Sequence, residues 1–453
     1  MNEPTILLVN PWIYDFAAYD LWVKPVGLLS IAGLLKKIGF RVHMIDCLDP
    51  HHPAMTRDRF SRQPKRKLTD RGHFHKQELP KPRQLLQVNK KYRRYGILPS
   101  VLEAELRNSP APSAILVTSM MTYWYPAVVE TINTIKRIYP RVPVVLGGIY
   151  ATLCPEHARR YAGAHYVFTG PCNEDLLTLL NDLTGHQNNG CNEHFFPKPD
   201  CSLLSSKKSI PLLTSRGCPF SCTYCASNIL YPSFEQRDPR TIVSEIEHWI
   251  YEEETTDFVF FDDALLVNPE NHILPFLNEI IRRNIHVRFH VPNGLHVRAI
   301  DHTLSELLFR AGFKTLRLGL ESADPEIQIT TGNKVRNRDF VRAAQALLDV
   351  GFSSHEVGVY VLVGLPGQEF RSAYESVCFV LDNGLRPFVS EYSPIPGTAL
   401  WNSAVRSSPF PIADEPLFHN NTLLPCRWEK FTVRDLIKLK AISRKCADVK
   451  HHI

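Results

Sequence analysis

The chain has 453 residues, more than one hydrophobic core usually supports, so its length predicts two domains. Hydrophobic residues make up 44% and charged residues 22%, which excludes a disordered or fibrous protein. The net charge of +6 is uneven, because residues 51–100 carry a net charge of +11 and the rest of the chain −5. No apolar run could span a bilayer and no secretion signal is recognisable, so we expect a cytoplasmic protein without a membrane span.

Residues 1–184 alternate short apolar runs with helical stretches. Such an alternation predicts an α/β fold with an open, doubly wound parallel sheet, whose ligands lie outside the C-terminal ends of the strands. A basic insert at 55–100 interrupts this domain between its second and third strands. The five predicted strands are 6–9, 41–46, 114–119, 142–146 and 166–169.

The rest of the chain has three predicted parts. Residues 185–209 are rich in Asn, Ser, Lys and Pro and are predicted to be a linker. Residues 210–400 contain six strand–helix units, which predict a partial (βα)6 barrel with its working end at the C-terminal strand ends. Residues 401–453 are expected to form a short helical cover over the barrel. The six predicted strands are 210–214, 258–261, 286–291, 314–320, 356–363 and 387–392.

Three of the eleven cysteines, Cys218, Cys222 and Cys225, lie within eight residues after the first barrel strand. The odd count in a chain with no export signal argues against a disulfide framework. A structural zinc site would need a fourth ligand, and the nearest downstream candidate, His248, falls inside a predicted helix. Three thiolates suit a 4Fe–4S cluster with one open iron. Zinc, or thiols without a metal, is the less favoured interpretation.

The spacing C-x3-C-x2-C, with Tyr224 before the last cysteine, resembles the signature of the radical S-adenosylmethionine (SAM) superfamily. The resemblance covers about residues 205–400. It implies that the reduced cluster cleaves SAM to methionine and a 5′-deoxyadenosyl radical, with electrons from a donor such as flavodoxin or ferredoxin. The residues that match the SAM-binding positions of the family are Asp262, Asp263, Asn293, Glu321, Ser322 and Gly364.

Some of these residues also have purely structural interpretations. Asp262 or Asp263 could cap a helix, and Asn293 could form only a turn. Glu321 could be a buried ion-pair partner of a nearby arginine, with Arg317 and Arg298 as the candidates. We expect SAM binding for Glu321 and for at least one of the two aspartates.

The first domain, followed by such a barrel, resembles the flavodoxin-like cobalamin-binding domain of the cobalamin-dependent radical SAM enzymes. Ser119 ends the third strand, and Gly147 and Gly148 end the fourth, where glycine lets the backbone approach a bulky ligand. The resemblance implies cobalamin, with these three residues as contacts. The loop 10–27 departs from many cobalamin proteins, because it has no D-x-H-x-x-G motif and no histidine to bind cobalt. It carries aromatic residues that could cover a corrin face or form a domain interface: Trp12, Tyr14, Phe16, Tyr19 and Trp22.

The basic insert has two charged runs, at 65–67 and 90–95, and the second contains two tyrosines. Basic runs with interleaved aromatic residues are typical of nucleic-acid patches, but most such runs are solvated surface. Nucleic acid is the less favoured partner here. An anionic small substrate or the cobalamin phosphate suits the charges equally well.

These patterns together predict a cobalamin-dependent radical SAM methyltransferase that acts on an unactivated carbon of a small-molecule substrate. One alternative is a radical SAM cyclase or rearrangement enzyme, or a radical SAM enzyme without cobalamin. An alternative of another class is a non-catalytic corrinoid- or SAM-binding sensor. Release of 5′-deoxyadenosine separates an enzyme from a sensor, and a methylated product separates the two enzyme readings.

Overall fold

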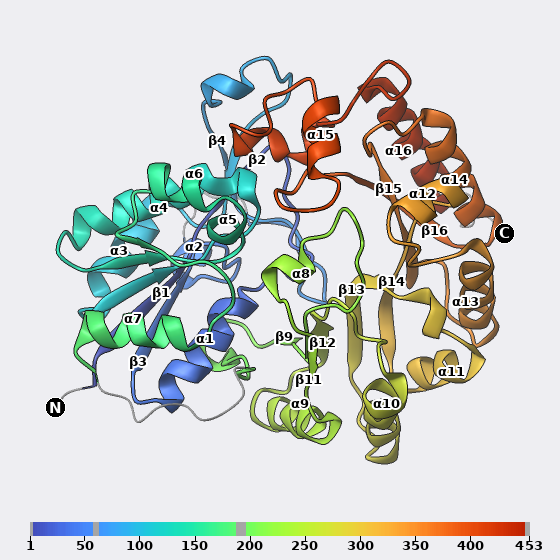
Figure 1. Cartoon of the computed structure of the whole chain (residues 1–453). Helices are drawn as coiled ribbons and strands as arrows, with labels where there is room; N and C mark the ends of the chain where they lie inside the picture. Colours follow the sequence, from blue (N-terminus) through green and yellow to red (C-terminus); the bar gives the residue numbers. More distant parts are fainter. Residues whose placement is uncertain (1–2, 58–62, 187–195, 449–453) are drawn as a thin grey trace. The chain divides into compact units, whose positions relative to one another are not determined.

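The structure is a computed structural model that describes residues 3–57, 63–186 and 196–448. The chain divides into two compact units, residues 1–207 and 208–453 (Figure 1). In the described part of the chain, no helix is both long and apolar enough to cross a membrane.

The first unit contains a five-stranded parallel sheet with the strand order β3-β1-β6-β7-β8. This is the doubly wound, flavodoxin-like order, and the predicted fold is confirmed. The strand order reverses between β1 and β6, and such a switch point opens a crevice at the C-terminal ends of the strands. The strands are β1 (Thr5–Asn10), β3 (Arg41–Asp46), β6 (Ala114–Val117), β7 (Val144–Leu146) and β8 (Tyr166–Val167).

Helices cover both faces of this sheet (Figure 1). One face is covered by α1 (Val26–Lys37) and α7 (Glu174–Thr184), whose buried leucines form a single core with β1 and β6. The N-terminal turn of α7 is capped by Asn173, whose side chain accepts a hydrogen bond from the backbone N–H of Leu176. The other helices of the unit are α2 (Pro53–Arg57), α3 (Pro99–Asn108), α4 (Tyr125–Ile138), α5 (Ile149–Leu153) and α6 (Pro155–Tyr161).

The described end of the predicted linker packs against α1. The backbone N–H of Asp200 donates to the carbonyl of Leu29 at 2.9 Å, and Lys36 forms an ion pair with Asp200 at 2.6 Å. At Gly33 a Cβ would lie 2.3 Å from the carbonyl oxygen of Lys198, so only glycine allows this close approach. Residues 198–200 are therefore fixed to the first unit.

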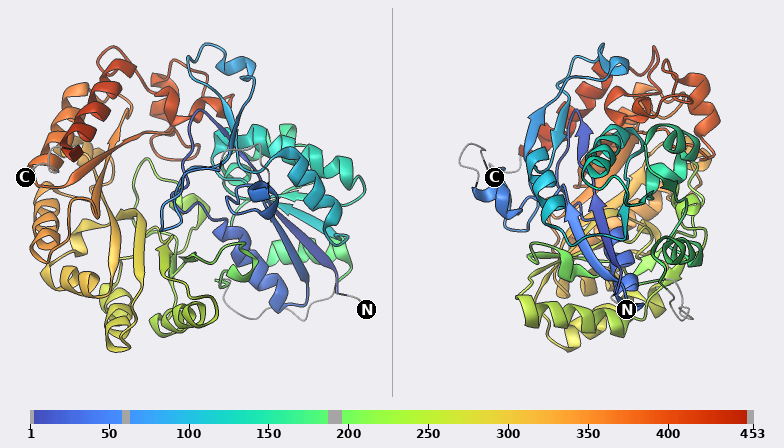
Figure 2. Two further views of the ribbon diagram at one scale, coloured as in Figure 1. Left: turned by 180° about the vertical axis from the view of Figure 1, so that it is seen from behind. Right: turned by 90° about the vertical axis from the view of Figure 1, so that its left-hand side faces the viewer.

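The loop predicted at 10–27 contains a strand, β2 (Ile13–Asp15), and this prediction was wrong in that respect. β2 pairs antiparallel with β5 (Arg93–Tyr95) of the basic insert, and β5 pairs with β4 (Lys76–Glu78). Figure 2 shows these strands apart from the larger sheet of the unit. The strand was missed because its pairing partner lies about eighty residues away in the sequence.

The aromatic residues of this loop belong to the core of the first unit. Trp12, Tyr14, Phe16 and Trp22 are buried, and only Tyr19 is exposed. The indole N–H of Trp12 donates to the carbonyl of Ile97 and that of Trp22 to the carbonyl of Thr69. The two tyrosines of the insert, Tyr92 and Tyr95, are also buried, so they do not offer rings for stacking on nucleic-acid bases.

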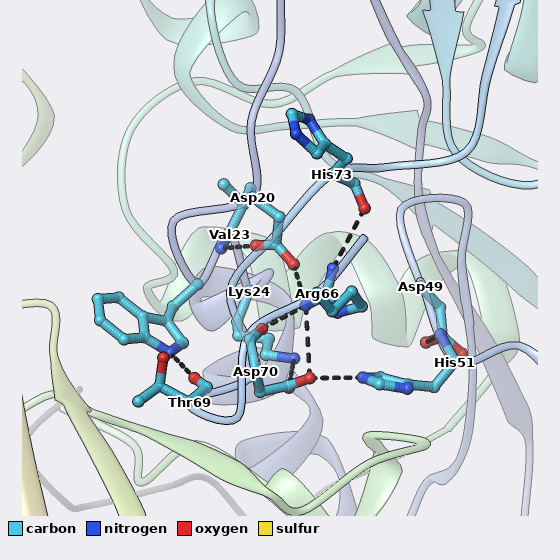
Figure 3. Close-up of polar contacts among 10 residues, drawn as sticks. Asp20, Val23, Lys24, Asp49, His51, Arg66, Thr69, Asp70 and His73 are labelled. Atoms are coloured by element: carbon cyan, nitrogen blue, oxygen red, sulfur yellow. Dashed lines mark hydrogen bonds and ion pairs between the residues drawn. The ribbon is translucent and has the colours of Figure 1, made fainter. Parts of the chain in front are cut away.

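A buried ion-pair network holds the insert against the neighbouring loops (Figure 3). The carboxylate of Asp70 is 1% exposed and contacts His51 at 2.5 Å and Lys24 at 3.5 Å, while Arg66 pairs with Asp20 at 2.7 Å. Burial alone would raise the pKa of Asp70, but the hydrogen bond from His51 and the charges of Lys24 and Arg66 outweigh it and hold the pKa well below its usual value. Asp70 is thus a charged centre of this network.

The second unit contains a six-stranded parallel sheet in which each strand neighbours the next one along the chain. Helices connect successive strands, as the predicted partial barrel requires. The strands are β9 (Ser209–Leu212), β12 (Asp257–Phe260), β13 (Arg288–Leu295), β14 (Phe313–Glu321), β15 (Val357–Val363) and β16 (Arg386–Glu391). The main helices are α9 (Pro239–Glu253), α10 (Ile273–Arg282), α11 (His302–Arg310), α13 (Asn337–Asp349) and α14 (Phe370–Asp382).

Local sequence signals set the ends of these helices. Asp238 caps α9 by accepting from the N–H of Arg240, with Pro239 at the first helical position. Gly312 and Gly351 follow α11 and α13 with positive φ angles of 93° and 105°. The C-terminal segment adds α15 (Trp401–Ser407) and α16 (Val433–Asp448), and α16 packs against β16 and α14. The edge strand of the sheet is therefore covered.

Candidate cluster and cofactor sites

The loop with the three cysteines starts at the end of β9 and has a closed base. The two-residue strands β10 (Ser215–Arg216) and β11 (Glu235–Gln236) pair antiparallel across it. Gly217 has a φ of 77°, and a Cβ there would lie 2.2 Å from the carbonyl oxygen of Ser233. Only glycine fits at this position, directly before Cys218.

Asp262, which follows β12, fixes the start of this loop by hydrogen bonds. Its buried carboxylate accepts from the backbone N–H of Thr214 at 3.2 Å and from the hydroxyls of Thr214 and Ser215, each at 2.6 Å. The backbone N–H of Ser215 also donates to it. These donors contact mainly Oδ1 of Asp262, and a SAM contact at this residue stays a prediction. Asp262 positions the cluster loop relative to β12.

One pocket of about 290 Å³ gathers most of the predicted site residues of the second unit. It lies at the C-terminal ends of the strands, where partial and complete barrels place their active sites. The predicted residues that line it are Cys218, Cys222, Cys225, Asp263, Asn293 and Glu321. The other lining residues are Phe220, Tyr224, Ser227, Gly294, Lys334, Tyr360 and Ser390.

Asn293 and Glu321 lie at the irregular ends of β13 and β14, and their side chains line the pocket. The pairing register shifts between β13 and β14 near Gly294, and again between β14 and β15 at Glu321. Glu321 adopts a positive φ of 64°, which is unusual for a residue other than glycine. The Asn293 side chain is held by hydrogen bonds from its amide to the carbonyls of Phe261 and Asp262, at 3.1 and 3.2 Å.

Two predicted contacts, Ser322 and Gly364, do not line this pocket. Ser322 is buried; its hydroxyl lies 3.3 Å from the Ser376 hydroxyl and accepts from the N–H of Asp324. The N–H of Gly364 donates to the side chain of Gln368 at 2.7 Å. SAM contacts at these two positions remain predictions.

The three thiols that line the pocket suit a 4Fe–4S cluster. Three thiols around a shared space are what a cubane needs, because each thiolate binds a different iron. Burial raises the pKa of Cys218 to about 11 and also raises that of Cys222. Without iron these thiols are protonated, and metal binding displaces the protons.

Lys334 is a pocket residue that the sequence reading missed. A Cβ added to Gly319 would lie 2.9 Å from the carboxylate oxygen Oε1 of Glu321 and 3.1 Å from Nζ of Lys334, so both charged groups approach the same glycine. Burial raises the pKa of Glu321, and Lys334 and the hydroxyl of Tyr224 partly offset that rise. Lys334 follows α12 (Pro325–Thr330) in a Gly-Asn-Lys turn, and that turn was the available signal.

The two arginines considered as partners of Glu321 have other contacts. Arg317 donates to the carbonyl of Leu316 and lies over the ring of Phe388 at 4.5 Å. Arg298 donates to the carbonyl of Asn333. Glu321 has Lys334 as a cationic neighbour in the pocket.

Aromatic and backbone contacts also fix the middle of the cluster loop, at Phe220 and Thr223. Phe220 stacks on His296 with ring centroids 4.0 Å apart, and burial lowers the pKa of His296 to about 3, so the imidazole is neutral. The N–H of Thr223 donates to the carbonyl of Thr331. The loop is therefore held by the residue that follows β13 and by the segment that leads to Lys334.

In the first unit, the predicted cobalamin residues form one corner at the ends of β6 and β7. The hydroxyl of Ser119 donates to the carbonyl of Gly147 at 2.6 Å, and it accepts from the N–H of Ala151. Gly148 has a φ of 88°, and a Cβ there would lie 2.4 Å from the carbonyl oxygen of Ser119. Gly148 is therefore required by the corner itself.

Other glycines at this edge of the sheet leave room for a ligand. A Cβ added to Gly147 would meet no atom closer than 3.9 Å, and at Gly27 and Gly170 it would meet none within 4 Å. Gly27 lies in the first turn of α1, and Gly170 follows β8. Exposed backbone at strand ends fits a large ligand that approaches the sheet closely, as cobalamin would.

Comparison with known proteins agrees with both sites. Residues 212–377 match the family model of the radical SAM superfamily, and residues 92–179 match the B12 binding domain. The chain belongs to the cobalamin-binding radical SAM family. It is an enzyme, and its cofactors are a 4Fe–4S cluster, SAM and cobalamin.

Several curated relatives of this radical SAM enzyme match at low identity. An uncharacterized methyltransferase of Pyrococcus horikoshii is 24% identical over 73% of this chain and 74% of its own length. The bacteriochlorophyllide d C-8(2)-methyltransferase of Chlorobaculum tepidum is 24% identical over 65% of this chain and 66% of its own length. The anaerobic magnesium-protoporphyrin IX monomethyl ester cyclase of Rubrivivax gelatinosus is 22% identical over 54% of this chain and 50% of its own length.

Solved structures share the fold. The radical SAM methyltransferase TsrM of Kitasatospora setae superimposes with a TM-score of 0.65 at 17% identity, covering 89% of this chain and 76% of TsrM. The cobalamin-dependent radical SAM enzyme OxsB gives a TM-score of 0.55 at 13% identity, covering 98% of this chain and 61% of OxsB.

Proposed function

We propose that this radical SAM enzyme is a cobalamin-dependent methyltransferase that acts on an unactivated carbon of a small molecule. The observation that carries the proposal is the presence in one chain of two cofactor sites: the cysteine pocket of the second unit and the glycine-lined strand edge of the first. Several relatives named as methyltransferases support methyl transfer over other radical reactions.

We assign cluster ligation to Cys218, Cys222 and Cys225. The remaining pocket residues suit the amino-acid end of SAM, because Lys334 offers a cation for its carboxylate and Asp263 an anion for its ammonium group. Asp263 is held by the hydroxyl of Ser227, which donates to it at 3.0 Å. When bound, the cluster and SAM supply a radical that removes hydrogen from a substrate, and cobalamin supplies a carrier for methyl groups.

The residues around the pocket have defined tasks in this proposal. Asp262 and the Phe220–His296 stack hold the cluster loop in place, and Tyr224 and Lys334 hold Glu321. Preorganised contacts of this kind align reacting groups before the chemical step. The cluster also needs one-electron reduction, and we propose a donor such as flavodoxin or ferredoxin.

The test uses the anaerobically reconstituted, corrinoid-loaded enzyme and SAM labelled in its methyl group. With an acceptor substrate, we expect a labelled product together with both 5′-deoxyadenosine and S-adenosylhomocysteine. Release of 5′-deoxyadenosine with no S-adenosylhomocysteine would favour a cyclase or rearrangement reaction, such as the reaction named for the Rubrivivax relative. Absence of both products under reducing conditions would favour a sensor.

A further inference from the structure

A second cavity of about 610 Å³ lies entirely within the first unit. None of the glycines that leave room at the strand edge lines it. It is formed by the β4–β5 hairpin, the segment 63–65 and residues near α2. Five of the side chains around it are basic or imidazole groups, and no aspartate or glutamate of the described chain lines it. These five are Lys65, His73, His75, Lys76 and Arg94.

Two of these cations, Lys65 and Lys76, are exposed and have no carboxylate partner among the residues that the structure describes. Nearby cations of the same region differ in this respect. Arg66 is paired with Asp20, and Lys91 is paired with Glu78 at 2.8 Å. Figure 3 shows Asp20 and Asp70 in contact with Arg66. Two positive charges therefore remain at the cavity without a counter-charge.

Arg94 provides a buried and oriented guanidinium on the same cavity. The residue is 6% exposed, and its guanidinium lies over the ring of Trp12 at 5.4 Å. It donates to the side chain of Gln77, its antiparallel neighbour across the β4–β5 pair. The carboxylate of Glu130 is 3.7 Å away, a distance that leaves donors of the guanidinium for another acceptor.

We propose that this cavity binds a phosphate-type anion. A planar, fixed guanidinium beside two mobile ammonium groups is the arrangement that recognises the several oxygens of a phosphate or diphosphate. His73 and His75 add further hydrogen-bonding groups to the lining. The anion belongs either to a free phosphorylated molecule or to the phosphodiester of the corrinoid, and the two sources share this chemistry.

The test measures binding of inorganic pyrophosphate to the full-length protein by titration calorimetry. The test variant is Lys65→Glu/Lys76→Glu. The matched control is Arg83→Glu/Lys90→Glu, which changes the net charge equally at exposed insert positions outside the cavity. We expect the test variant to bind pyrophosphate at least about tenfold more weakly, since it loses charge-assisted hydrogen bonds, and the control to stay within about twofold of wild type.

Two outcomes would overturn the proposal: no binding of millimolar pyrophosphate to the wild-type protein, or equal weakening in the test and control variants. Unchanged melting temperatures of the variants show that folding is not the cause of a loss. Repeating the titration with corrinoid-loaded protein identifies the source. Retained binding indicates a separate phosphorylated molecule, and displacement together with weaker corrinoid binding in the test variant indicates the corrinoid phosphate. Binding is measured without turnover, so failure of the proposed methyl transfer would not affect this result.

Discussion

Single residues determine the charges that line the cysteine pocket of the second unit. Lys334 and Asp263 bring opposite charges to one lining, and both lie near the three cysteines. Neither charge ligates the cluster in our assignment, so their effects on SAM binding can be separated from cluster assembly. Buried charges also connect separate loops of the first unit, where Asp70 contacts Lys24 and Arg66 pairs with Asp20.

We expect Lys334→Gln to raise the KM for SAM about tenfold or more, because the carboxylate of SAM loses a charge-assisted hydrogen bond in a partly enclosed pocket. The iron content and the thiolate-to-iron absorption band should stay at wild-type values. Lys314→Gln is the matched control, since Lys314 lies outside the pocket and forms an exposed ion pair with Glu356 at 3.4 Å. A wild-type KM in Lys334→Gln would remove Lys334 from SAM binding.

Asp70→Asn should destabilise the first unit by about 3–5 kcal/mol at pH 7, because it leaves buried cations without their counter-charge. The pKa of Asp70 in the folded state lies below its value of about 3.9 in the unfolded chain. The ionised carboxylate therefore stabilises the fold above about pH 4, and this contribution is lost as the pH falls further. Urea unfolding of both proteins between pH 3 and 7 measures the difference, which should shrink below pH 4. A difference that is constant with pH would contradict this role.

At the scale of elements, two adjacent glycines after β7 have different structural roles, although the sequence pattern does not distinguish them. A Cβ added to Gly147 would have free space around it, whereas a Cβ added to Gly148 would collide with the backbone of Ser119, and Gly148 has a positive φ. The sequence pattern predicted the same role for both. Gly148 is needed to form the corner, and ligand approach at Gly147 stays a prediction.

Gly147→Ala should therefore fold like the wild-type protein but bind corrinoid more weakly. Gly148→Ala should lower the free energy of unfolding by about 2 kcal/mol or more, because alanine is strained at this φ and its Cβ would collide with Ser119. Thermal unfolding and corrinoid retention after gel filtration measure the two effects. Equal stability of both variants would show that the corner does not depend on Gly148.

Elements with local signals could be predicted from the sequence. The buried strands and the capped helix α9 have apolar periodicity, and Asp238 and Pro239 mark the start of that helix. The cysteine spacing also predicts the cluster loop, since the three expected ligands are neighbours in sequence. β2 could not be predicted, because a three-residue strand depends on a partner in the insert. Lys334 was missed because its approach to Glu321 depends on how the connection that follows β14 folds back past α12.

At the scale of the whole molecule, the chain combines two units that each place their candidate site residues at the C-terminal ends of parallel strands. Such ends collect side chains and loops from many parts of the sequence, so both units can hold a large cofactor with little regular structure of its own. The basic insert adds a third candidate site to the first unit. Among these sites, the cluster pocket is the one on which the radical chemistry depends.

The most direct test of the account is therefore SAM cleavage by the wild-type enzyme and by the Cys218→Ala/Cys222→Ala/Cys225→Ala variant. Both proteins are reconstituted with iron and sulfide under anaerobic conditions, reduced, and incubated with SAM. We expect about four irons per wild-type chain, the number in one cubane, and release of 5′-deoxyadenosine. The variant should hold no cluster and release none. Formation of 5′-deoxyadenosine by the triple variant at the wild-type rate would contradict the account.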